Sequence, residues 1–238
     1  MSLKIKLKYY IFNKLLSIFR KNNINVSFSQ CGEDLLIQYI FRLRGIDKIT
    51  YIDIGANNPI YLNNTLLFYL KGSKGINIEA NPNLINLFLK HRVKDTNLNV
   101  GIYSKNEIKK FYIFNDLTLR TFSDEEAKKM ENLYNHKIKQ VIEIQTYTLN
   151  EIINKYNNGQ FPDLLSIDIE GMEFEVLKTI DYNVSFPKVI CIETAEYSPI
   201  GIGRKRNEII NFLKEKGYFL FADTNLNSIF VKNDFFDK

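Results

Sequence analysis

Short apolar runs alternate with amphipathic stretches through most of the chain, beginning at residue 49. The apolar runs have the length of single buried strands, and they predict strands near 49–54, 75–79, 97–102, 163–168 and 188–193. The stretches between them have apolar residues at helical spacing, and they predict helices near 61–70, 83–91, 148–157, 172–181 and 205–216. This alternation predicts an α/β fold with a mostly parallel sheet that is covered by helices on both faces.

Two later stretches depart from this alternation. Residues 107–146 are less regular, with strands predicted at 110–114 and 141–146 around a polar, helix-prone segment. An insertion of this kind is suited to form a lid or one wall of a substrate site. Near the end of the chain, the apolar segments 218–222 and 228–231 flank the polar turn DTNLN, which predicts a closing hairpin with an antiparallel edge strand.

The first residues predict a separate basic helix. Residues 3–20 have apolar side chains near helical spacing with lysines between them. Such a helix could pack on the domain, join two copies in a homodimer, or lie on an anionic membrane, and we favour packing against protein. We therefore expect an amphipathic helix within 1–26 and one domain over 27–238, with the insertion at about 107–146.

Composition and charge exclude several classes of protein. A chain of 238 residues that is 45% hydrophobic suits one domain with a sizeable core. The net charge of +5 is concentrated near the N-terminus and in residues 204–206, so we expect no nucleic-acid partner. Cys31 and Cys191 lie too far apart to predict a disulfide framework or a zinc site. No run of about 20 apolar residues is present, and we expect a cytoplasmic protein, with peripheral contact at the inner membrane as an alternative.

The clearest candidate for ligand binding is the first strand and the turn after it, YIDIGANNP. Gly55 permits a tight turn that brings the backbone N–H groups of Ala56 and Asn57 close to a ligand. A dinucleotide fingerprint would require three glycines, and only one is present here. The acidic Asp53 also disfavours a diphosphate and suits a ligand with an ammonium group, such as the methionine part of S-adenosylmethionine (SAM).

The segment KGINIEANP supplies a second candidate, Glu79, followed by Ala80. Glu79 ends the next strand roughly twenty residues after Gly55, the separation at which a carboxylate can accept both hydroxyls of a ribose. The alternative is that Asp53 and Glu79 only cap or solvate strand ends. We favour ligand binding because the two acids occur together at this spacing.

The third candidate is DLLSIDIEGMEFEVL, where an apolar strand delivers Asp168 and Glu170 to the carboxyl edge of the sheet. Ligands sit at that edge in open parallel sheets, so these carboxylates could deprotonate or orient a substrate hydroxyl. They could instead be acids that the dipole of the following helix favours, and the catalytic interpretation is stronger for Asp168. His136, in the insertion, is a weaker candidate for a general base.

The next strand ends at Glu193 and leads to Tyr197 and a loop between two glycines, which could close over a substrate. Arg204 could bind a phosphate or carboxylate of that substrate, although charge runs are most often solvated surface. Asp168, Glu170 and Glu193 could together hold Mg²⁺. We do not favour this alternative, and we assign no metal ligand.

Six ordered segments between about residue 29 and residue 231 resemble the FkbM family of SAM-dependent methyltransferases: SQCGEDLL, YIDIGANNPIYLNNT, KGINIEANP, QTYTLNEII, LLSIDIEGMEFEVL, and VICIETAEYSP with DTNLNSIFV. The resemblance implies a Rossmann-like class I methyltransferase fold, with a seven-stranded sheet whose last strand is antiparallel. It also implies O-methylation of a sugar or polyketide hydroxyl in a surface-polysaccharide or natural-product pathway.

The resemblance further implies roles for single residues. Asp53, Gly55 and Asn57 would form the methionine end of the cofactor site, and Glu79 would hold the ribose. Asp168 would stand beside the sulfonium. Gln30 and Glu33 would close the site from the N-terminal side.

We therefore predict a SAM-dependent O-methyltransferase whose acceptor is a small-molecule, nucleotide-linked or lipid-linked sugar. One alternative is an NAD-dependent oxidoreductase on a similar sheet, which the missing glycines disfavour. The other is a non-catalytic subunit of a glycan assembly complex, which the presence of Asp53, Glu79 and Asp168 disfavours. The sequence does not identify the acceptor.

Overall fold

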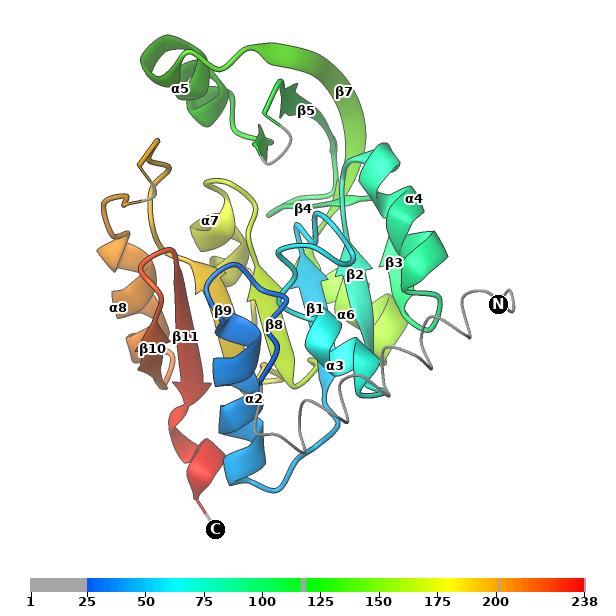
Figure 1. Cartoon of the computed structure of the whole chain (residues 1–238), viewed down its shortest axis with the longest axis vertical. Helices are drawn as coiled ribbons and strands as arrows, with labels where there is room; N and C mark the ends of the chain where they lie inside the picture. The colour runs from blue at the N-terminus through cyan, green and yellow to red at the C-terminus, as the bar shows by residue number, and fades with distance from the viewer. Residues whose placement is uncertain (1–24, 117–118, 201, 238) are drawn as a thin grey trace.

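The computed structural model describes residues 25–116, 119–200 and 202–237, so the helix expected within 1–26 falls almost entirely outside the described residues. The domain is built on a seven-stranded sheet with the order β10-β11-β9-β8-β1-β2-β3 (Figure 1). Its strands are β1 (Thr50–Ile54), β2 (Lys74–Ile78), β3 (Thr96–Leu98), β8 (Leu164–Ile167), β9 (Val189–Glu193), β10 (Tyr218–Asp223) and β11 (Asn227–Lys232).

The centre of the sheet is parallel and buried on both faces. β1 pairs in parallel with β2 and with β8, and β8 pairs in parallel with β9. All residues of β8 and β9 are buried, as expected for nearly continuous apolar strands between two layers of helices. β11 runs antiparallel to both β9 and β10. The predicted mostly parallel sheet with an antiparallel last strand is therefore confirmed.

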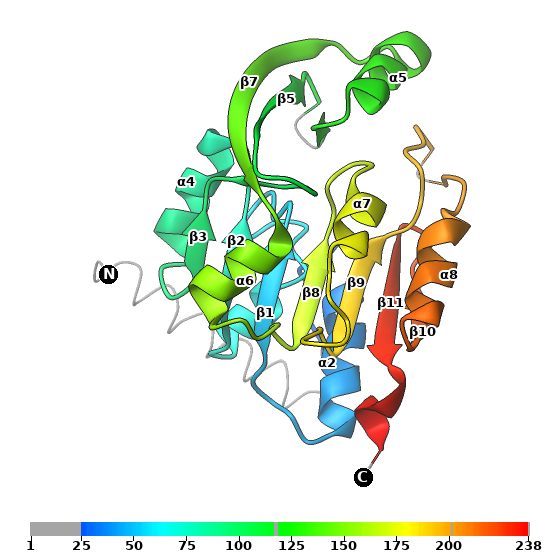
Figure 2. The ribbon, with the colours of Figure 1, turned by 180° about the vertical axis from the view of Figure 1, so that it is seen from behind.

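Helices cover both faces of this sheet (Figures 1 and 2). One face packs against α6 (Leu149–Asn157), α7 (Glu173–Lys178) and α8 (Asn207–Glu215), and the other against α2 (Glu33–Leu43) and α3 (Leu66–Leu70). α4 (Pro82–His91) connects β2 to β3. β1 shows the alternation directly, because Ile52 and Ile54 join the first of these cores and Tyr51 joins the second. Among the described helices, none has the length and apolar character that a membrane span requires.

The segment 107–146 forms most of a second sheet, which arches above the carboxyl edge of the first (Figure 2). Its strand order is β4-β7-β5-β6, and α5 (Asp124–Tyr134) lies between β6 and β7. The strands are β4 (Gly101–Ile102), β5 (Ile108–Phe114), β6 (Arg120–Thr121) and β7 (Ile138–Tyr147). The strands expected at 110–114 and 141–146 are both present, as parts of β5 and β7. This second layer is placed to close a site at the edge of the main sheet.

Two predicted elements were wrong in extent. The strand expected at 97–102 is divided, because Asn99 turns the chain by donating its amide hydrogens to the backbone oxygens of Glu79 and Ala80, at 2.8 and 2.9 Å. β3 therefore stays in the main sheet, and β4 joins the second sheet. The helix expected at 61–70 begins only at Leu66, since Leu62 has a positive φ of 50°, which an α-helix does not allow.

We expect Leu165→Ala to lower the free energy of unfolding by about 2–5 kcal/mol, because Leu165 in β8 is fully buried and its truncation leaves a cavity. Leu133→Ala is the matched control, since this side chain in α5 is 70% exposed and its loss should cost under about 0.5 kcal/mol. Urea denaturation of the two variants measures the difference. Equal effects would contradict the described core.

Candidate active site

The ends of four neighbouring strands bring the predicted acidic residues to one edge of the main sheet, beneath the second sheet (Figure 1). Glu79 and Asp168 directly follow β2 and β8, and Glu193 is the last residue of β9. Asp53 lies near the end of β1 and is buried. The parallel register of these strands places their carboxyl ends side by side. The sequence interpretation that these groups share one edge is therefore confirmed.

The turn after β1 is held tightly between β2 and β8. Gly55 has a φ of 74°, and its N–H and that of Ala56 donate to the Ile78 carbonyl at 3.0 and 3.1 Å. A Cβ atom on Gly55 would lie 1.8 Å from the backbone oxygen of Asp168. Glycine is therefore required here both for the backbone conformation and for the close approach of the segment after β8.

Glu79 is buried and anchors this turn from the other side. Its Oε2 accepts a hydrogen bond from the N–H of Asn57 and its Oε1 one from the N–H of Asn81, both at 2.8 Å. Burial raises the pKa of Glu79, while the positive charge of Arg120 and the two backbone hydrogen bonds act in the opposite direction. Because each carboxylate oxygen can accept more than one hydrogen bond, Glu79 keeps capacity for the hydroxyls of a ligand.

Two cavities meet at this edge. The first, the β2-side cavity, combines Glu79 with aliphatic and aromatic walls, and its lining includes Glu79, Ala80, Val100, Ile102, Phe111 and Phe122. The second, the β9-side cavity, is more polar, and its lining includes Asp53, Asn63, Asn64, Glu193, Glu196 and Tyr197. Gly55, Asn57, Asp168 and Glu170 line both cavities. Two ligands could therefore meet at Asp168 and Glu170.

The carboxyl groups at this meeting point raise one another's pKa. Burial raises the pKa of Asp168 to about 7, and the nearby charge of Glu173 adds to the shift, while Arg120 opposes it. The pKa values of Glu170 and Glu193 are also raised, first by burial and then by the negative charge of Asp168. A carboxyl group with a pKa near neutrality can accept and release a proton under physiological conditions.

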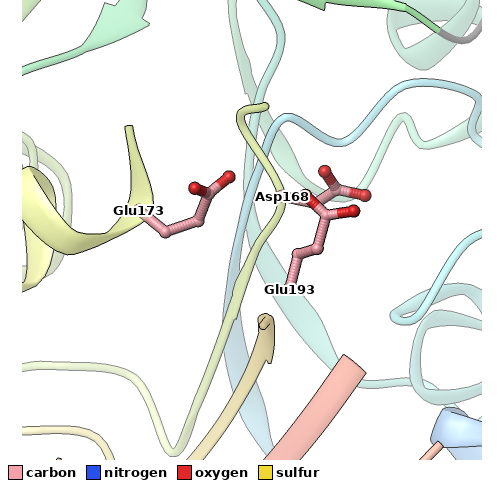
Figure 3. Close-up of side chains that lie close together, drawn as sticks. All are labelled: Asp168, Glu173 and Glu193. Carbon is pink, nitrogen blue, oxygen red and sulfur yellow. The ribbon is translucent and has the colours of Figure 1, made fainter. Parts of the chain in front are cut away.

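Glu173 comes close to this group and is held by the backbone (Figure 3). Its Oε1 accepts from the N–H of Ile169 at 2.8 Å and its Oε2 from that of Gly171 at 3.1 Å, and it forms an ion pair with Arg206. Ligand atoms of Asp168, Glu173 and Glu193 lie within 4.8 Å of one another. Among the described carboxylates, the set close enough to share a cation thus includes Glu173 in place of the predicted Glu170.

The two residues expected to close the site from the N-terminal side lie in different places. Gln30 is exposed and lines the β9-side cavity. Glu33 is fully buried and lines neither cavity. Its Oε1 accepts from Thr224 and Asn227 at 2.8 and 3.0 Å, so it ties α2 to the β10–β11 hairpin. We therefore assign Glu33 a structural contact and leave it out of the proposed cofactor site.

Three other candidates lie toward the outside of the β9-side cavity. Tyr197 lines this cavity, and its hydroxyl is 2.7 Å from Nε2 of His136. His136 itself lies between α5 and β7 and lines neither cavity, so it supports Tyr197 and is not placed as a base. Arg204 is exposed and also lines neither cavity.

The contribution of the second sheet to the β2-side cavity was not predicted from the sequence. Phe111, Arg120 and Phe122 all line it, and the rings of Phe111 and Phe122 lie 4.5 Å apart. The hydroxyl of Thr121 donates to the backbone oxygen of Glu170 at 2.9 Å, which ties β6 to the segment after β8. The alternating pattern predicted strands in this region but not the face that each side chain would present.

Comparison with known proteins identifies the family. A model of the methyltransferase FkbM domain matches residues 53–220, which is most of the chain. The chain belongs to the FkbM methyltransferase family. This assignment and the strand order agree with the class I methyltransferase fold that the sequence resemblance implied. The family assignment favours a methyltransferase over the alternative of an NAD-dependent oxidoreductase, in line with the single glycine of the turn.

Solved structures show distant likeness to this FkbM chain. The FkbM methyltransferase of Methylobacillus flagellatus KT is 13% identical, with a TM-score of 0.41, and the match covers 78% of this chain and 44% of that one. A TehB-like SAM-dependent methyltransferase of Corynebacterium glutamicum ATCC 13032 Kitasato is 11% identical, with a TM-score of 0.42 and coverage of 95% and 99%. This chain thus spans less than half of the M. flagellatus protein. No curated protein matched the sequence.

We expect Gly55→Ala to destabilise the protein strongly, because the added Cβ would meet the Asp168 carbonyl and displace it. Gly45→Ala is a matched control, since Gly45 also has a positive φ, of 68°, but has open space around its would-be Cβ. The control should lower the free energy of unfolding by about 1–2 kcal/mol, because alanine disfavours the positive φ. Gly55→Ala should lower it clearly more. Equal costs in urea denaturation would show that the turn does not approach β8 so closely.

Proposed function

We propose that this FkbM protein is a SAM-dependent O-methyltransferase that methylates a hydroxyl of a sugar or glycan precursor. The observation that carries the proposal is the junction of the two cavities at Gly55, Asn57, Asp168 and Glu170. Methyl transfer requires donor and acceptor to be held in contact and in line, and a shared wall between two cavities supports that arrangement.

The β2-side cavity suits the nucleoside part of SAM. Val100, Phe111 and Phe122 offer apolar walls for an adenine ring, and Glu79 has capacity to accept the ribose hydroxyls. Asp53 lies on the other side of the turn, where it could bind the ammonium group of the methionine part. When bound, SAM supplies an electrophilic methyl group on a positively charged sulfur.

Asp168 is the proposed general base. Its pKa of about 7 lets it take the proton from an acceptor hydroxyl near neutral pH, and it lies where both cavities meet. Glu170, Glu193 and Tyr197 line the β9-side cavity beside it and would orient the hydroxyl. The concentration of polar side chains in this cavity supports a polyhydroxylated acceptor, free or attached to a nucleotide or lipid.

Asp168→Asn should leave SAM binding close to wild type and lower turnover by roughly 10²–10⁴-fold, because the amide cannot accept the proton. Asp47→Asn is the matched control, since Asp47 is exposed, precedes the amino end of β1 and lines neither cavity. Binding is measured by calorimetry, and turnover by transfer of a radiolabelled methyl group to a panel of nucleotide-linked sugars.

The pH dependence tests the same role. Because the base must be deprotonated, the wild-type rate should rise as the pH increases through about 7 and then level off. Turnover of Asp168→Asn near the wild-type value, or a wild-type rate that is flat between pH 6 and 8, would contradict Asp168 as the base.

We expect a chelator to leave turnover unchanged. Mg²⁺ at the cluster of Asp168, Glu173 and Glu193 would need the Glu173 oxygens, which already accept two backbone hydrogen bonds and pair with Arg206. The test is turnover after dialysis against EDTA, with and without added Mg²⁺. Loss of activity that Mg²⁺ restores would show that the cluster binds a metal after all.

A further inference from the structure

Arg92 follows α4 and is fully buried beneath the turn after β1. A guanidinium group has five N–H donors, and a buried charge is tolerated only when it is well paired. All five donors of Arg92 have acceptors: Asp95 Oδ2 at 3.0 Å for Nε, the Pro59 carbonyl at 3.3 Å and Asn63 Oδ1 at 3.1 Å for Nη1, and the Tyr51 hydroxyl and Thr65 Oγ1, both at 2.9 Å, for Nη2.

These contacts fix which way Asn63 and Thr65 point. Arginine donates hydrogen bonds and accepts none, so Asn63 must turn its oxygen toward Arg92. The amide nitrogen of Asn63 then faces Asp53 Oδ2, at 3.3 Å, and the Ala56 carbonyl, at 3.2 Å. The Thr65 oxygen accepts from Arg92 in the same way, which directs its own hydrogen away from the guanidinium. Asp53 Oδ2 lies 2.9 Å from it and Asn63 Oδ1 lies 3.0 Å from it. The hydrogen goes to Asp53, because Asn63 Oδ1 already accepts from Arg92 and from the Thr65 N–H, and a carboxylate is the stronger acceptor.

Asp53 therefore receives a hydrogen bond from Asn63 and one from Thr65, and Arg92 sets the direction of both. Burial raises the pKa of Asp53, while the Thr65 hydrogen bond, the charge of Arg92, and hydrogen bonds from Ser166 and Asn63 act in the opposite direction. Hydrogen bonds to an ionised acceptor are stronger than those to a neutral one, so this arrangement favours the carboxylate form. Asp53 itself lines the β9-side cavity next to Gly55 and Ala56.

We propose that Arg92 is a positioning residue for cofactor binding: through Asn63 and Thr65 it holds the Asp53 carboxylate toward the amino-acid end of SAM. Arg92 lines neither cavity, so it acts without touching the ligand. The inference rests on the proposed function, in which Asp53 binds the ammonium group. Lysine cannot replace arginine here, because its three donors cannot serve five acceptors in one plane.

The test compares S-adenosylhomocysteine, which has the amino-acid part, with 5′-methylthioadenosine, which lacks it. Thr65→Val removes the hydroxyl without changing the size of the side chain, and Arg92→Lys removes the planar donor set. Both variants should bind S-adenosylhomocysteine roughly tenfold more weakly or worse, because a hydrogen bond to a charged group is lost. Binding of methylthioadenosine should stay within about twofold of wild type, since the nucleoside end is untouched.

Two further variants serve as controls. Thr146→Val removes another fully buried hydroxyl, in β7, whose hydrogen bonds go to Lys105 and Glu107, and it should change neither affinity. Thr65→Ser keeps the hydroxyl and should restore the affinity for S-adenosylhomocysteine. In Thr65→Val this affinity should also be lost at a higher pH than in the wild type, because Asp53 then protonates more readily. That shift is not expected from a purely structural defect.

The outcomes separate the two proposals. Suppose that the wild type binds S-adenosylhomocysteine, and that Thr65→Val either binds it equally well or loses both ligands to the same degree. The positioning role of Arg92 is then overturned, while the proposed function stands. If the wild type binds neither ligand, the proposed function fails and this inference fails with it. If Arg92→Lys does not fold, Thr65→Val still decides the question.

Discussion

The structure depends on how it accommodates several carboxyl groups at one buried edge of the main sheet. Removing an ionised carboxylate from water is costly unless hydrogen bonds or an opposite charge compensate for it. Asp53 is compensated by Asn63, Thr65 and the charge of Arg92, and Glu79 by two backbone N–H groups. Glu173 is compensated by two further backbone N–H groups and by Arg206.

The other carboxyl groups at this edge are compensated less completely. Burial raises the pKa of Asp168, Glu170 and Glu193, and neighbouring carboxyl groups add to the shift. The positive charge of Arg120 at Asp168 and Glu170, and of Arg206 at Glu193, opposes the shift only in part. The edge thus holds acids whose oxygens accept several hydrogen bonds beside acids whose pKa is raised by burial and by neighbouring carboxyl groups. The first kind suits binding, and the second suits proton transfer to and from an acceptor.

Much of this arrangement followed from the sequence, because it depends on strand order and strand ends. Apolar runs located the central strands, and the acids at their ends identified Asp53, Glu79, Asp168 and Glu193. Arg92 could not be found in this way, since its partners come from separate loops and strands and form no local pattern.

The division of the strand at 97–102 escaped prediction for a similar reason, because tertiary hydrogen bonds of Asn99 override a continuous apolar run. The same limit applies to the second sheet. The alternating sequence pattern predicted its strands. The placement of Arg120 and Phe122 over the β2-side cavity, however, depends on how that sheet folds back over the first. Contacts between distant segments, more than the elements themselves, were what the sequence alone left open.

The central claim is that the turn after β1 and the end of β2 bind an adenosyl ligand with an amino-acid part, and not a dinucleotide. Isothermal titration of the purified protein with S-adenosylhomocysteine and, separately, with NAD⁺ tests it most directly. The account predicts saturable binding of S-adenosylhomocysteine with one site per chain and no measurable binding of NAD⁺. Binding of NAD⁺ alone, or of neither ligand, would contradict it.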